Sequence, residues 1–161
     1  MTENLLNKED GRRNSWSGIL ALILAFFGAI VSFWGALVTY VSQAQNPEAS
    51  LWPLPGLVLI DWVFLGLMAF LTVYMSFRQR STKWVRLAWL ITGMLIPLII
   101  LGAFSIGLAV LVAFLLFVFS TIILAVRQES KWLESFVLLM FGAIVNLGIL
   151  WIIIILGNQS Y

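Results

Sequence analysis

Three residues that could support chemistry lie inside long apolar stretches of this 161-residue sequence: Asp61, Asn146 and Pro97. An ionisable group inside a membrane-like apolar run is costly, so Asp61 is a functional candidate by default. If the apolar run begins near Leu57, Asp61 lies only about 6 Å inside it. The favoured role is therefore an interfacial anchor or a hydrogen-bond partner for another helix. A proton or cation site and a contact with a partner subunit are the alternatives.

Asn146 and Pro97 can each be interpreted either structurally or functionally. The Asn146 amide lies near the middle of an apolar run and needs a partner, which a neighbouring helix usually provides. Pro97 removes a backbone N–H and frees the carbonyl of Gly93, four residues earlier. Helices broken in this way line substrate sites in some transporters. Interhelical packing for Asn146 and a plain kink at Pro97 are favoured over ligand contacts.

Small residues recur at four-residue spacing in two apolar runs. This spacing places them on one face of a helix, where they let two backbones approach closely. The stripes could pack inside the protein or bind another subunit, and the sequence leaves both open. The members are Gly28, Ser32 and Ala36 in the first run and Ser105, Ala109 and Ala113 in a later one.

Several kinds of active site are excluded by missing residue types. The chain has no cysteine and no histidine, which removes thiol chemistry, histidine-ligated metals and haem, and serine–histidine catalysis. A paired-carboxylate site needs a second acidic residue beside Asp61, and no other lies within an apolar run. We therefore expect no catalytic residues, no metal, no cofactor, no nucleic-acid partner and no enzyme activity.

The composition indicates an integral membrane protein. Apolar residues make up 62% of the chain and charged residues 10%, with a mean hydropathy of +1.06. Soluble domains are about 45–50% apolar and about 25% charged, and so short a chain could not bury this excess. The lipid bilayer is the expected surrounding.

The basic residues predict how the chain crosses the membrane, because positive charges collect in cytoplasmic loops. They are also candidates for contact with anionic headgroups, worth about 1 kcal/mol each. All nine fall in three clusters: Lys8, Arg12 and Arg13; Arg78, Arg80, Lys83 and Arg86; and Arg127 and Lys131.

If every cluster is cytoplasmic, each segment between clusters crosses the membrane an even number of times. Residues 87–126 carry no charge, and as one helix they would be about 60 Å long, twice the hydrocarbon thickness. Two spans with a turn at 101–107 fit better, although a single crossing would leave four spans in all. A cleavable signal peptide ending near Ala44 is the less favoured reading, because the run of about 17–41 exceeds a signal's 7–15 residues.

The predicted fold is thus an all-α bundle of five transmembrane helices with the N-terminus in the cytoplasm and the C-terminus outside. Trp16, Trp84 and Trp132 fall at the predicted cytoplasmic starts of spans, where Trp is enriched. Short loops and the strong charge bias favour a prokaryotic plasma membrane. The predicted segments are a tail at 1–15, a helical domain at 16–156 with spans of about 17–41, 56–77, 84–101, 106–126 and 135–156, and a tail at 157–161.

The leading functional hypothesis is a non-catalytic accessory or scaffold subunit of a membrane assembly, or a self-associating one. The alternative is a small oligomeric transporter or channel that uses Asp61 as an ion or proton site. A membrane-embedded sensor, signalling through its short cytoplasmic loops, is a third class.

Overall fold

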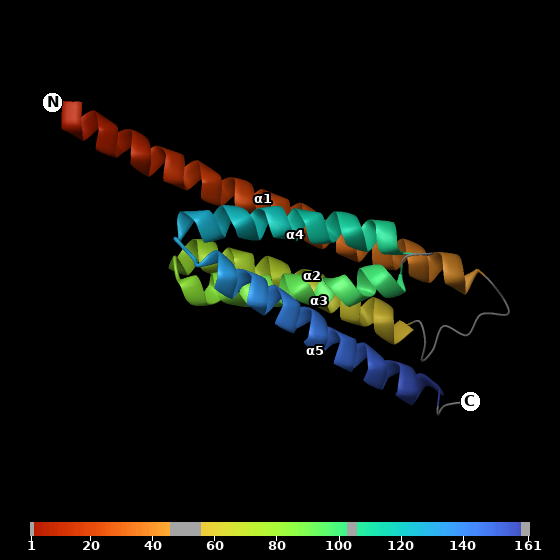
Figure 1. The fold of residues 1–161 in the computed structure, drawn as a ribbon. Coiled ribbons are helices and arrows are strands. Elements are labelled where there is room, and N and C mark those ends of the chain that lie inside the picture. The colour runs from red at the N-terminus through yellow and green to blue at the C-terminus, as the bar shows by residue number, and fades with distance from the viewer. Residues whose placement is uncertain (1, 46–55, 103–105, 159–161) are drawn as a thin grey trace.

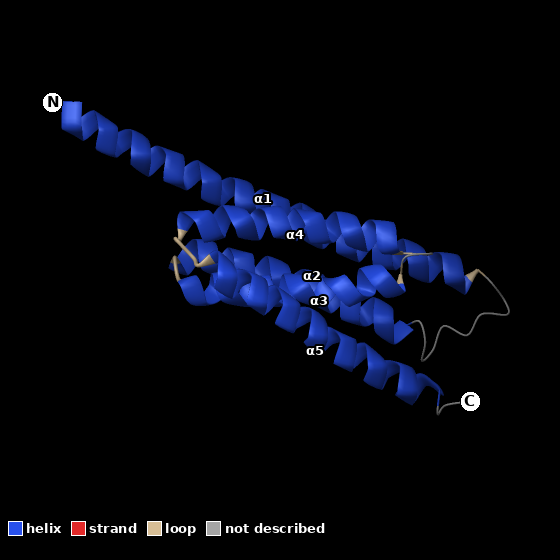
Figure 2. Cartoon of the chain, in the orientation of Figure 1, coloured by secondary structure: helices blue, strands red, loops and turns tan. Residues whose placement is uncertain are grey.

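Five helices form the protein in the computed structural model, which describes residues 2–45, 56–102 and 106–158, with side chains for 16–45, 56–102 and 106–156. Each helix contains a stretch long and apolar enough to cross a membrane. The protein is thus a multi-pass helical bundle, which confirms five spans over four (Figures 1 and 2). The helices are α1 (Thr2–Ala44), α2 (Gly56–Gln79), α3 (Thr82–Leu101), α4 (Gly107–Arg127) and α5 (Trp132–Asn158).

Two short turns join helices at the end of the bundle that we call the basic end. There α2 turns into α3 and α4 turns into α5, on the same side as the N-terminus (Figure 1). Each turn contains a non-glycine residue in the left-handed region, Arg80 at φ 48° and Glu129 at φ 52°. Residues 2–15, which we predicted only as a cytoplasmic tail, continue the helix of α1.

Helix α3 lies at the centre of the arrangement. It packs against α2, α4 and α5, whereas α1 packs against α2 and α4 on the far side. Helix α5 depends almost entirely on α3 for its contacts and diverges from the bundle toward the C-terminus (Figure 1). Helix α3 ends at Leu101 and α4 begins at Gly107. Both residues lie within the uncharged segment 87–126, so the connection between the two helices carries no charged residue.

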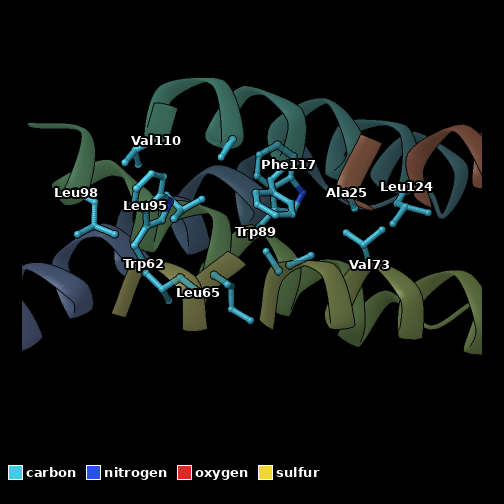
Figure 3. Close-up of a cluster of buried hydrophobic side chains, with 14 of the residues drawn as sticks. Ala25, Trp62, Leu65, Val73, Trp89, Leu95, Leu98, Val110, Phe117 and Leu124 are labelled. Atoms are coloured by element: carbon cyan, nitrogen blue, oxygen red, sulfur yellow. The ribbon is translucent and has the colours of Figure 1, made fainter. Parts of the chain in front are cut away.

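Helix α1 turns a face of small residues toward the bundle and its large residues outward. Bulky side chains of the neighbouring helices fill the notches of this face: Trp62 of α2 lies against Gly35, and Phe117 of α4 lies 3.0 Å from where a Cβ of Gly28 would stand. Both aromatic rings are fully buried (Figure 3). The members of the face are Gly18, Ala21, Ala25, Gly28, Ser32, Gly35 and Ala36.

The small-residue stripes found in the sequence therefore pack inside the protein. Ser32 is buried against Gly66 of α2, and Ala36 is buried nearby. In α4, Ala113 is fully buried and Ala109 faces Gly35. Ser105 lies outside the described residues.

Helices α3 and α5 touch backbone to backbone. A Cβ on Gly93 would collide with the backbone of Leu139, and a Cβ on Gly142 would collide with the backbone of Leu90. Each glycine thus lies against the residue three positions before the other glycine. Only glycine allows this approach on both sides of the contact, so the pair sets how closely α5 can pack.

We predict that Gly142→Val separates α5 from α3. The added side chain meets backbone rather than a flexible side chain, so the cost should be at least about 1–3 kcal/mol of stability. Thermal unfolding in detergent measures it, and cysteine pairs placed across the α3–α5 contact should lose their crosslink. The matched control is Gly148→Val in the same helix, where an added Cβ meets nothing within 4 Å. Equal stability of the two variants would contradict the backbone contact.

Candidate intramembrane polar site

Asn146 is held at the contact between α5 and α3. From Gly142 onward the buried positions of α5 recur every four residues, and Asn146 follows Gly142 in that series with no exposed surface. Its Nδ2 donates a hydrogen bond of 2.6 Å to the backbone carbonyl of Met94. The close approach at Gly142 brings the amide within reach of the α3 backbone one turn further along.

The hydrogen bond to Met94 lies beside the gap that Pro97 leaves in the backbone hydrogen bonding of α3, which we call the Pro97 break; the helix itself continues from Thr82 to Leu101. Pro97 is buried within the helix, and its missing N–H leaves the Gly93 carbonyl without its usual helical donor. The neighbouring carbonyl, that of Met94, is the one Asn146 reaches. The proline break and the amide from α5 therefore fall at the same level of the bundle.

Asp61 completes the cluster from α2. Its carboxyl lies within hydrogen-bonding reach of the Asn146 amide, where α2 and α5 meet over a short stretch. Asp61 is five residues into α2, about 7.5 Å along the helix axis from its first residue. The structure thus brings together Asp61, Asn146 and the Pro97 break from three different helices.

Two side-chain oxygens of this cluster lack a hydrogen-bond partner among the described residues. Asp61 Oδ2 and Asn146 Oδ1 are both buried, and neither has a hydrogen-bond partner in the described part of the chain. Buried acceptors without donors are costly. The arrangement can therefore act as an interhelical tie through the Asn146 amide, and its spare oxygens can also accept a proton or a hard cation, for which oxygen is the preferred ligand.

Sequence reasoning missed two further hydrogen bonds between helices. Ser120 Oγ of α4 donates to the Ala21 carbonyl of α1 at 2.7 Å. Gln128, just after α4, donates through Nε2 to the Ser76 hydroxyl of α2 at 2.9 Å. A single hydroxyl in an apolar helix usually bonds its own backbone, as Thr121 does to Phe117. The sequence therefore gives no signal that separates Ser120 from such residues.

The basic residues occupy different environments at the basic end. Arg86 pairs with Glu134 at 2.7 Å, which joins α3 to α5. Arg127 lies over the Phe77 ring at 5.6 Å from its centre. Arg78, Arg80, Lys83 and Lys131 are exposed, whereas the side chains of Arg12 and Arg13 lie outside those described.

The structure also contains an apolar cavity that is separate from this polar cluster. It measures about 590 Å³ and lies between α1 and α2, where Phe33, Tyr40, Leu59 and Phe64 help to line it. Neither Asp61 nor Asn146 lines it. Its walls are almost wholly apolar and offer no chemistry, so the polar cluster is the stronger candidate site.

No protein family, curated protein or solved structure matches this chain. The function is therefore argued from the residues and their geometry.

We predict that Asp61 and Asn146 are energetically coupled. Asn146→Leu should cost about 0.6–2 kcal/mol, because it removes a polar contact within the membrane. In a double-mutant cycle with Asp61→Leu, the coupling should reach at least about 0.5 kcal/mol, since the two groups share one contact. Stability in detergent measures all four proteins. A parallel cycle of Asn146→Leu with Ser120→Ala should be additive, and additivity in both cycles would refute the Asp61–Asn146 contact.

Proposed function

We propose that the protein is a non-catalytic accessory or scaffold subunit of a membrane assembly, in the plasma membrane of a prokaryote. The observation that carries this proposal is the outward face of α5. Helix α5 contacts mainly one neighbour, α3, and the rest of its surface is open. On that open surface lies a glycine, Gly148, with nothing within 4 Å of the place where its Cβ would stand.

Gly148 makes no close packing contact within the described bundle. Glycine in a helix interior costs about 1 kcal/mol relative to alanine, and at Gly93 and Gly142 close packing offsets that cost. Gly148 has no such contact. It forms a notch between large exposed side chains on the same face, Ile144 (65% exposed) and Trp151 (68% exposed). A notch of this kind fits the backbone of another transmembrane helix.

The packed interior also supports a scaffold role. Trp62, Leu95 and Phe117 are fully buried and fill the space between α1, α2, α3 and α4 (Figure 3). Large side chains in the middle of the bundle favour a solid helical unit that binds through its outer faces.

We predict that Gly148→Leu weakens association without unfolding the bundle. The bulky side chain fills the notch, which should cost about 1–3 kcal/mol at a helix contact, while the open space around Gly148 leaves α5 undisturbed. The tagged protein is extracted gently from its native membrane, and native mass spectrometry reports what stays bound.

Ile144→Leu, which keeps size and polarity on the same face, is the control and should retain its partners. Foreign subunits in fixed ratio that Gly148→Leu loses would support the accessory role, and a homo-oligomer that it loses would support self-association. A monomer from the parent protein would overturn the proposal.

A second candidate function is a small oligomeric transporter or channel in which Asp61 binds a proton or cation. The meeting of Asp61 with Asn146 beside the Pro97 break favours it, because both side chains keep a buried oxygen without a donor. Five helices with one carboxylate inside their apolar runs form a narrow unit, so a pathway would run between copies of the chain.

For this second function we predict that Asp61→Asn abolishes ion or proton flux into proteoliposomes. The amide keeps the shape and can still bond Asn146, but it cannot carry the charge that a transported cation requires. Ser120→Ala, which alters a polar contact between α1 and α4, should keep its flux. Flux from the parent protein that survives in Asp61→Asn, or no flux from the parent, would exclude Asp61 as a transport site.

A further inference from the structure

A polar cavity of about 230 Å³ lies at the basic end, between the turn that follows α2 and the end of α4. Arg80, Thr82, Arg127 and Gln128 line it. In contrast to the apolar α1–α2 cavity, every lining residue carries a hydrogen-bond donor. Arg80 follows the end of α2 and Arg127 ends α4, so the two arginines are far apart in the sequence and meet only in the folded bundle.

The two guanidinium groups belong to residues that line the same cavity, so their like charges repel each other. Neither forms an ion pair with a described side chain: Glu129, in the turn after α4, makes no described salt bridge, and Glu134 of α5 pairs with Arg86 instead. Arg127 is held in place by the Phe77 ring and by Gly18, where any larger side chain would collide with its guanidinium. The fold therefore places two like charges at one cavity, and Glu129 in the adjoining turn forms no described ion pair with either of them.

The beginning of α3 adds further positive potential. Thr82 is the first residue of that helix, and the preceding Ser81 makes no side-chain cap. The first N–H groups of a helix lack intrahelical acceptors and attract anions. Near the end of α4, the carbonyls of Leu124 and Ala125 are already satisfied, since Gln128 N donates to Leu124 and Ser130 N donates to Ala125. The cavity thus offers donors in excess of acceptors.

The backbone of Arg80 has a conformation that is unfavourable for a residue with a side chain. Its left-handed φ of 48° is a conformation that glycine adopts freely and that a side chain disfavours by about 1–2 kcal/mol. Glycine is the common residue after a helix end for this reason. An arginine at such a position is retained at a cost in stability, which the guanidinium in the cavity can explain.

We propose that this cavity binds a phosphate group, and that an anionic lipid headgroup supplies it. Arg127 is the last residue of its membrane-spanning helix and Arg80 directly follows another, so the guanidiniums lie where headgroup phosphates lie. A pair of arginines matches phosphate oxygens in geometry and charge. Gln128 Oε1 is buried without a partner in the described chain, which leaves an acceptor for a headgroup hydroxyl.

The test uses the full-length protein in detergent, titrated with phosphatidylglycerol and, separately, with phosphatidylcholine, whose phosphate carries its own cation. Native mass spectrometry counts the lipid retained. We expect preferential retention of phosphatidylglycerol, and about five-fold or greater weakening in Arg80→Gly. Thermal stability of Arg80→Gly should equal or exceed that of the parent, because glycine relieves the backbone.

Glu129→Gly is the matched control. It relieves the same left-handed backbone in the other turn but leaves both arginines, so it should retain phosphatidylglycerol. Arg127→Met, which keeps the apolar stem against Phe77, should lose retention as Arg80→Gly does. Equal retention of the two lipids, or full retention by both arginine variants, would overturn the site.

Competition with inorganic phosphate distinguishes a lipid headgroup from free phosphate as the ligand. If millimolar phosphate leaves the bound phosphatidylglycerol in place, the lipid is supported as the ligand. If it displaces the lipid and binds in its absence, free phosphate is the ligand and the lipid assignment is wrong.

Discussion

Lipid surrounds these helices with a solvent as apolar as their own side chains, so burying leucine or phenylalanine gains little over leaving it exposed. Close packing and polar contacts must hold the bundle together instead. The small-residue face of α1 meets this constraint, because it admits Trp62 and Phe117 to depths that larger residues would block. The large residues of α1 point outward, in an order opposite to that of a soluble helix, because the bilayer accepts them without penalty.

The same constraint explains why α5 is attached as it is. One helix contact must hold it, and that contact joins backbones at Gly93 and Gly142 and then adds the hydrogen bond from Asn146 to Met94. The bond lands beside the Pro97 break, where α3 is weakest in its own hydrogen bonding. The packing contact and the polar cluster therefore form one structural feature. Asp61 joins it from α2, which contacts α5 over a short stretch.

The sequence alone was enough to predict the number of helices, because charge clusters, turn residues and hydrocarbon thickness each constrain the crossings independently. It also singled out Asp61, Asn146 and Pro97 one by one. Their meeting could not be predicted, since it depends on how each helix is rotated about its axis, and an apolar helix such as α5 has little amphipathic pattern to indicate that rotation. For the same reason the sequence predicts Arg80 and Arg127 as topology signals and as separate headgroup contacts, but not as two parts of one site. Forty-six residues separate them, and their convergence needs both turns in place.

The polar cluster and the basic end differ in the groups that they leave unpaired, and this difference separates their chemistry. At Asp61 and Asn146 the unpaired atoms are oxygens, which attract protons and cations. At Arg80 and Arg127 the unpaired groups are guanidiniums and helix N–H donors, which attract anions. Both arise because short loops supply few counter-charges: the described acidic side chains beyond Asp61 are Glu129 and Glu134, and Glu134 is used by Arg86. In a chain with so few charged residues, groups from the surroundings must complete the polar sites. At the basic end, we propose, those groups are phosphates.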